Sequence, residues 1–183
     1  MAERTVKELV KKKNKSKAKG SAFERTVCKM LSLWISNNKH DDLFWRSAMS
    51  GGRATVRYKY KKGQKSTQGG DITAVHPLGN KLTDIFSIEC KSYKNIHLQT
   101  SILNKAPKQA SLLDFWNQTK RDAETQNKLP MLIAKQPNLA VIVCIDENGL
   151  KRLQTNDVEY IYVSDLDMYI IKFDRLINVC KLR

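Results

Sequence analysis

The run Phe86–Lys91 carries the clearest chemical pattern of this 183-residue chain, because polar and apolar residues alternate along it. Successive side chains of a strand point to opposite faces, so Glu89 and Lys91 would share one face while their apolar neighbours enter a core. Asp71 lies upstream, behind two glycines and at the start of a second predicted strand. If the two strands pair as a hairpin, the two carboxylates reach the same end of the sheet.

Two carboxylates at one end of a sheet predict a divalent metal site. Asp71, Glu89, the main-chain carbonyl of Cys90 and water molecules could coordinate Mg²⁺, which prefers oxygen ligands in octahedral geometry, and Mn²⁺ is expected to substitute for it. Lys91 would orient or activate an attacking hydroxide and neutralise phosphate charge. The simpler alternative is a solvated strand face that carries an ordinary Glu–Lys neighbour pair.

A third carboxylate, Glu24, lies in a segment with helical periodicity. Apolar side chains recur at helical spacing over residues 23–34, which predicts a helix that starts at Ser21 and stops near residues 37–38. Ser21 and Glu24 have the spacing of a capping box, which is one interpretation of this glutamate. Glu24 also continues a partly apolar row through Cys28, so we expect it to face protein and to serve the active site.

The charge distribution predicts a polyanionic partner. The chain has 33 Lys and Arg against 18 Asp and Glu, a formal net charge of +15. Residues 1–20 and 51–68 each carry a net charge of +6, and the rest of the chain is nearly balanced. Nucleic acid fits this pattern better than an anionic membrane surface, because the basic N-terminal segment lacks the apolar face of an interfacial helix.

Composition excludes several other classes of protein. The apolar fraction is 41% and the charged fraction 28%, which is typical of a globular domain. The longest apolar run, Leu139–Ile145, is too short to span a membrane, and no secretory signal is visible. Four scattered cysteines without metal-ligand spacing argue against a zinc finger and indicate buried thiols in a reducing, cytoplasmic compartment.

The elements that must position these residues alternate between helix and strand. A second helix is predicted over residues 112–123 with Ser111 as its cap, and Pro77–Asn80 is predicted as a turn. Strands are expected at 43–48, 71–75, 84–91, 131–135, 139–145, 160–163 and 168–173. The basic stretch 53–68 fits either a hairpin or a flexible loop. This order predicts an α/β or α+β sheet with helices packed on it.

The pattern Asp71…Glu89-x-Lys91 resembles the PD-(D/E)xK nuclease superfamily, and Gly20-Ser21-x-x-Glu24-Arg25 resembles the first helix of archaeal-type Holliday junction resolvases. The resemblance implies a restriction-endonuclease-like fold with a central mixed β-sheet flanked by helices. It implies that Glu24 joins the metal site, directly or through water, and that the protein works as a two-fold homodimer. In the stretch 44–52 it places Arg46 on a phosphate and Ser50 in a catalytic loop.

Further features extend or limit this resemblance. The run Trp116-x-Gln118-x-x-x-Asp-Ala is similar to one shared by phage-encoded PD-(D/E)xK endonucleases, and Lys135 is a further candidate for the site. Gly70 stands at the place of the superfamily's proline, which is often absent, and the basic insertion 53–68 is interpreted as a DNA-contacting flap. The predicted DNA contacts are Lys17, Lys19, Arg25, Arg46, Ser50, Arg53, Arg57, Lys61, Lys62 and Gln118.

The sequence thus predicts a cytoplasmic Mg²⁺-dependent DNA endonuclease, most similar to a Holliday junction resolvase that acts on branched DNA. No membrane partner is expected. We expect a basic flexible arm over residues 1–19, a nuclease core over 20–145 and a C-terminal extension of the same domain over 146–183. Two alternatives stay open: another PD-(D/E)xK DNase linked to restriction or recombination, and a non-catalytic basic nucleic-acid-binding protein.

Overall fold

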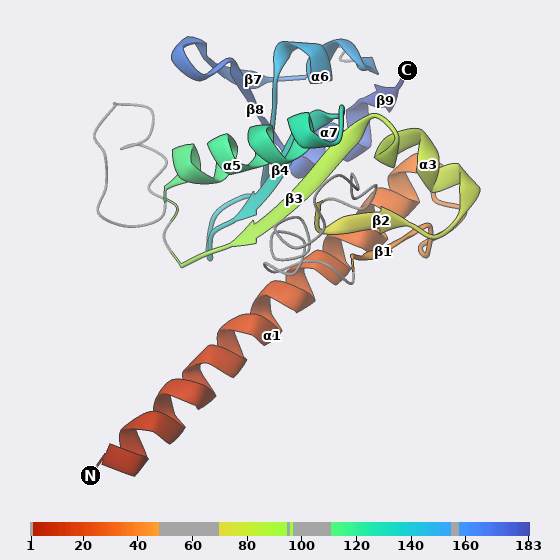
Figure 1. Ribbon diagram of the computed structural model, residues 1–183. Coiled ribbons are helices and arrows are strands. Elements are labelled where there is room, and N and C mark those ends of the chain that lie inside the picture. Colours follow the sequence, from red (N-terminus) through yellow and green to blue (C-terminus); the bar gives the residue numbers. More distant parts are fainter. Residues whose placement is uncertain (1, 48–69, 95, 97–110, 155–157) are drawn as a thin grey trace.

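The computed structural model describes residues 2–47, 70–94, 96, 111–154 and 158–183. Its centre is a five-stranded sheet with the strand order β3-β4-β5-β8-β7, in which β3 and β4 are parallel and the other neighbours antiparallel. The sheet strands are β3 (Phe86–Ser92), β4 (Leu129–Lys135), β5 (Ile142–Ile145), β7 (Tyr160–Val163) and β8 (Met168–Lys172). Helices flank this mixed sheet (Figure 1), which confirms the predicted α+β architecture.

Helix α5 (Leu112–Thr125) connects the two parallel strands and covers one face of the sheet. Ser111 caps it: its side chain accepts from the backbone N–H of Asp114, whose carboxylate accepts from the backbone N–H of Ser111. The predicted cap is therefore confirmed, with a capping box added. Phe115 and Trp116 of α5 pack on Leu132 and other sheet residues to form one half of the core.

Helix α1 (Ala2–Ile35) covers the opposite face with its C-terminal half, where Val27 and Leu31 are fully buried against the sheet. The helix was expected to start at Ser21, and this prediction is wrong: it starts at Ala2, so Ser21 is inside the helix and cannot cap it. Residues 2–20 are rich in Lys, Ala, Glu and Arg and contain no proline, and these residues favour helix. The segment expected to be an arm thus continues α1 away from the body (Figure 1).

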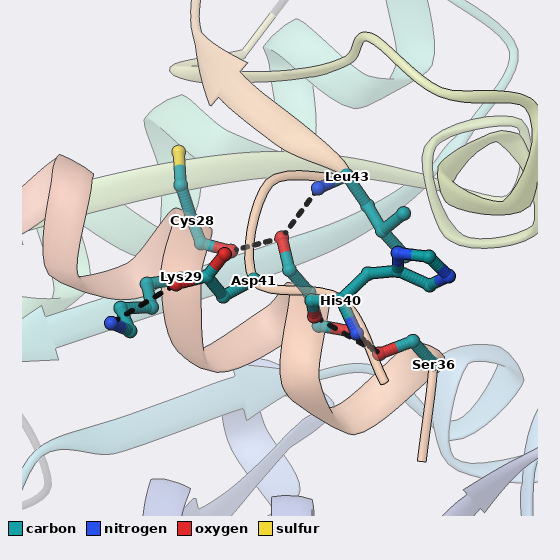
Figure 2. Close-up of polar contacts among 7 residues, drawn as sticks. Cys28, Lys29, Ser36, His40, Asp41 and Leu43 are labelled. Atoms are coloured by element: carbon teal, nitrogen blue, oxygen red, sulfur yellow. Dashed lines mark hydrogen bonds and ion pairs between the residues drawn. The ribbon is translucent and has the colours of Figure 1, made fainter. Parts of the chain in front are cut away.

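The end of α1 is tied to the chain that follows it (Figure 2). The Ser32 hydroxyl donates to the carbonyl of Cys28 at 2.8 Å and accepts from the backbone N–H of Leu43 at 3.0 Å. Asn37 and Asn38 have positive φ angles of 53° and 63°, as expected for the predicted helix stop. These contacts fix the path of the chain from the end of α1 to strand β1 (Phe44–Arg46).

Strand β2 (Ile72–Ala74) pairs with β1 in an antiparallel two-stranded sheet, in the register Trp45↔Thr73. The hairpin considered for 71–75 and 84–91 therefore does not form, because β2 pairs with β1 and β3 pairs with β4. The predicted turn at Pro77 is instead helix α3 (Pro77–Thr83), because His76 Nδ1 accepts from the N–H of Leu78 and proline suits the first helical position.

The C-terminal part of the chain completes the sheet, since β8 pairs with β5 and β7 forms the outer edge. The strand expected at 139–145 begins only at Ile142, and Leu139 is 60% exposed. The remaining short elements are α6 (Glu147–Lys151), β6 (Leu153–Gln154), the 3-10 turn η1 (Ser164–Leu166), α7 (Phe173–Val179) and β9 (Lys181–Leu182). All four cysteines are buried and free, as predicted. No described helix is long and apolar enough to cross a membrane.

Candidate functional site

Asp71 is held against the edge strand β3 by its own backbone and side chain. Its N–H donates to the carbonyl of Ile88 at 2.7 Å, and its Oδ2 accepts from the N–H of Cys90 at 2.9 Å. The carboxylate is therefore fixed beside the residue that separates Glu89 from Lys91. Although β2 does not pair with β3 as a ladder, these two bonds bring the predicted carboxylates together.

Gly70 permits this close approach. Its φ of +82° favours glycine, and a Cβ on it would lie 2.7 Å from the carbonyl oxygen of Ile88. A side chain at this position would push Asp71 away from β3. The structure thus gives a steric reason for glycine directly before Asp71.

Glu89 and Lys91 point to the face of β3 that α5 covers. Their partners in the parallel ladder are Leu132 and Ala134, which belong to the core beneath α5. Lys91 Nζ lies 3.3 Å from Glu89 Oε2 and 5.8 Å from the centre of the Phe115 ring. The predicted pair on one strand face is confirmed, and both side chains are largely shielded from water.

The electrostatics of this pair are set by burial and by the neighbouring carboxylate of Asp71. Burial, reinforced by the Asp71 carboxylate, raises the pKa of Glu89 from its ordinary 4.5 to about 8, while Lys91 opposes the rise. Burial lowers the pKa of Lys91, but Glu89 and Asp71 outweigh burial and raise it overall. The carboxylates of Glu89 and Asp71 therefore both act on the one ammonium group of Lys91.

Glu24 lies on the other side of β3. It belongs to α1, which packs on the face where Cys90 and Ile88 are buried, and it forms a short ion pair with Arg46 of β1. Burial raises the pKa of Glu24, the Arg46 hydrogen bond lowers it and Asp71 raises it again. Asp71, at the strand edge, therefore interacts electrostatically with both glutamates.

A cation at this site would have two carboxylates as its side-chain ligands. Within the described ranges, no group of three or more His, Cys, Asp and Glu residues is arranged to hold a metal ion. Asp71 and Glu89 nevertheless suit a hard divalent cation, because both offer buried carboxylate oxygens and the charge of Asp71 opposes the ionisation of Glu89 when no cation is bound. A main-chain carbonyl and water would supply the remaining ligands, which is typical of Mg²⁺.

The predicted DNA contacts are spread over several elements. Lys19 and Arg25 are exposed on α1, and Lys17 also lies in this helix. Arg46 forms an ion pair with Glu24. Gln118 on α5 donates to Asp122 Oδ2 at 3.4 Å. Ser50, Arg53, Arg57, Lys61 and Lys62 lie outside the described residues. Lys135, the further candidate, is at the end of β4 with its Nζ 5.8 Å from the Phe23 ring on the α1 face.

Two polar residues near the site were not predicted from the sequence: Asp122 of α5 and Gln126, the C-cap of this helix. Asp122 contributes to the raised pKa of Glu89, and Gln126 Nε2 donates to the Ser87 hydroxyl at 3.1 Å. Gln118, Asp122 and Gln126 recur every four residues, so their helical spacing was the available signal. The strand face they cover, shared by Ser87 and Glu89, could not be identified before the fold was known.

Comparison with protein families gives one match. The model of the family described as "Phage putative PDDEXK endonuclease" matches residues 15–182. Neither the curated proteins nor the solved structures yield a match. The matched range includes Glu24, Asp71, Glu89 and Lys91.

Proposed function

The chain belongs to the phage PDDEXK endonuclease family, and from this premise we propose that it is a Mg²⁺-dependent endonuclease that hydrolyses DNA phosphodiester bonds at Asp71, Glu89 and Lys91. The family makes it a nuclease; the metal and these catalytic residues are the proposal. The observation that carries it is the hydrogen bond from the N–H of Cys90 to Asp71 Oδ2, which supports a shared site for Asp71 and Glu89.

In this proposal Asp71, Glu89 and the carbonyl of Cys90 hold the cation, with Mn²⁺ as a substitute. When bound, the ion supplies Lewis-acid polarisation of the phosphate and charge neutralisation. The mutual repulsion of the two buried carboxylates supports this assignment, because a divalent cation relieves it. Glu24 would assist metal binding through a water molecule, and the effect of Asp71 on the pKa of Glu24 supports this role.

Lys91 is the proposed residue for the nucleophile and the phosphate. Its ammonium group is held by Glu89 at 3.3 Å and rests near Phe115, so its position is restricted. A fixed ammonium group orients a water molecule for in-line attack and offsets charge on the phosphate without reorganisation. Replacement of Lys91 by alanine should abolish cleavage while DNA binding persists, which separates this function from that of a non-catalytic binding protein.

For DNA binding we propose the basic residues of α1, together with Arg46, Gln118 and the basic insertion 53–68, which includes Arg53, Arg57, Lys61 and Lys62, with Ser50 just before it. The concentration of positive charge in residues 1–20 and 51–68 supports this assignment. Arg46 would contact a phosphate only if it leaves Glu24 or binds both groups at once.

The proposed substrate is branched DNA, as in Holliday junction resolvases, and the proposed active form is a two-fold homodimer. The outer edge of the sheet supports a dimer, because three side chains of β7 are about half exposed: Tyr160, Ile161 and Tyr162. This strand contains no proline or lysine that would block edge-to-edge pairing. Pairing with β7 of a second copy would bury these side chains. This edge is opposite β3, so the candidate sites of both copies would stay accessible.

The proposed function is tested by cleavage of a four-way junction and a matched linear duplex with and without Mg²⁺. We expect metal-dependent cleavage that Glu89→Ala abolishes and Glu124→Ala, which removes an exposed carboxylate of α5, leaves intact. Preference for the duplex would replace the junction assignment with another DNase of this superfamily. Cleavage that survives Glu89→Ala would refute the assigned site.

A further inference from the structure

Trp45 is an unusually exposed aromatic residue in the middle of strand β1. It is 63% exposed, whereas the preceding Phe44 is 1% exposed and part of the core. The other two tryptophans are satisfied within the fold: Trp116 is fully buried, and the Nε1–H of Trp34 donates to the carbonyl of Cys180 at 2.8 Å. A large indole left in water on a regular strand indicates a surface that meets a partner.

The fold ties Trp45 to the candidate catalytic site. Trp45 is paired with Thr73 in β2, two residues after Asp71. The N–H of Ser47 donates to the carbonyl of Asp71 at 2.8 Å, so the end of β1 is fastened to the catalytic carboxylate's own backbone. Figure 1 shows the β1–β2 pair alongside β3 and against α1. A group that contacts Trp45 is therefore held at a fixed place relative to Asp71.

The chemistry around Trp45 favours a nucleic-acid base as its partner. Alternation along β1 sends Phe44 and Arg46 inward, toward α1, and leaves the indole facing outward. The chain carries a net charge of +15, and its family acts on DNA, so a polyanion with exposed bases is the partner that its charge and its family favour. Exposed aromatic rings of basic proteins are a usual platform for unpaired bases, because the ring stacks on the base while cations elsewhere on the protein meet the phosphates.

We propose that Trp45 stacks on an unpaired base of the DNA substrate next to the cleavage site. The inference rests on the proposed nuclease function and makes it more specific: the preferred substrate exposes unstacked bases, as at a branch point, a gap or a splayed end. Intact duplex offers no free base face at that position, so Trp45 contributes little to its binding. Stacking of this kind does not depend on base identity.

Tryptophan fluorescence tests the contact directly, because Trp45 is the strongly exposed indole among the three. The full chain is titrated, without divalent metal, with a splayed-end DNA and with a fully paired duplex of equal length and charge. We expect quenching of fluorescence by the splayed DNA at saturation and little quenching by the duplex. Trp45→Phe should lose the quenching but keep most of the affinity, since phenylalanine can still stack.

Affinity measured by anisotropy provides the second readout. Trp45→Ala should weaken binding of the splayed DNA by roughly ten-fold or more and binding of the duplex by less than about two-fold. Leu139→Ala, which truncates a similarly exposed side chain far along the sequence, should alter neither. Equal affinities of wild type and Trp45→Ala for splayed DNA would overturn the proposal, as would a change of oligomeric state in Trp45→Ala with DNA binding retained.

The outcomes separate this inference from the proposed function. Loss of selective binding in Trp45→Ala would support base stacking even if the wild-type protein failed to cleave any DNA, a result that would refute only the nuclease proposal. Metal-dependent cleavage that is indifferent to Trp45→Ala on splayed DNA would refute only the stacking proposal. Absence of any DNA binding at low salt would refute both.

Discussion

The carboxylate of Asp71 accepts a hydrogen bond of 2.9 Å from the backbone N–H of Cys90, the residue that lies between Glu89 and Lys91. This bond joins two parts of the chain that belong to different sheets, because β2 pairs with β1 and β3 with β4. The site therefore depends on one side chain that bridges the sheets, and it should be sensitive to the charge and the position of that side chain separately.

The charge of Asp71 can be removed while its hydrogen bond is kept. Asp71→Asn retains an oxygen that accepts from the N–H of Cys90, so the fold should be preserved, while a predicted metal ligand is lost. We expect cleavage to fall by at least about a hundred-fold with a nearly unchanged melting temperature. Asp84→Asn, at an exposed carboxylate, serves as the control. Full activity of Asp71→Asn would exclude Asp71 from the metal site.

The position of Asp71 can be changed through Gly70. Gly70→Ala forces a Cβ to within 2.7 Å of the Ile88 carbonyl at a φ of +82°, so the variant should lose about 1–3 kcal/mol of unfolding free energy and most of its activity. Gly20→Ala is the matched control, because its nearest neighbour would be Glu24 at 4.0 Å within a helix. That change should stabilise α1 by up to about 1 kcal/mol. Urea unfolding of both variants measures the difference.

Local patterns in the sequence were sufficient to predict the elements that carry most of the site. The alternation around Glu89 predicts both the strand and the face shared with Lys91. The spacing from Ser111 predicts α5 and its cap, because capping involves only residues within one turn. Each of these predictions depends on contacts between neighbours in the chain, which a single sequence records.

Contacts between distant segments could not be predicted in the same way. The pairing of β2 with β1 rather than with the strand of Glu89 joins residues that are far apart in the sequence, which local patterns do not record. The capping-box interpretation of Ser21 failed because the preceding segment also favours helix. Glu24 was correctly expected to face protein, but its ion pair with Arg46 and its location across β3 from Glu89 follow from tertiary packing alone.

The pairing of Arg46 with Glu24 predicts a structural role for an arginine that the resemblance assigns to a phosphate. The Glu24 side chain is 13% exposed, so Arg46→Ala leaves a largely buried carboxylate without its partner. We expect a loss of about 1–3 kcal/mol in unfolding free energy, and less when Glu24→Gln is already present. The exposed Arg25, changed to alanine, should alter stability by less than about 0.5 kcal/mol. Additive effects in the Glu24–Arg46 double-mutant cycle would contradict the pairing.

The basic segment of α1 predicts steep salt dependence of DNA binding. If it neutralises several phosphates, the logarithm of the association constant falls with the logarithm of salt concentration by about 0.9 per phosphate. Deletion of residues 1–17 should flatten that slope by several such increments, weaken binding at low salt and leave metal-dependent cleavage detectable. A fluorescence anisotropy titration at several salt concentrations gives the slope, and an unchanged value would show that this segment does not touch DNA.

The raised pKa of Glu89 predicts how stability and metal binding depend on pH. Burial and Asp71 raise this pKa from 4.5 to about 8, so between these values the folded, metal-free protein holds a proton that the unfolded chain has lost. Its unfolding free energy should therefore fall as pH rises through this window and level off above pH about 8. Glu89→Gln, which is neutral throughout, should remove this decline, whereas Glu124→Gln, at an exposed carboxylate, should retain it.

Mg²⁺ must displace the same proton, so calorimetry near neutral pH in buffers of different ionisation enthalpy should detect proton release with wild type and not with Glu89→Gln. Parallel stability curves for wild type and Glu89→Gln would show that Glu89 is ionised in the fold.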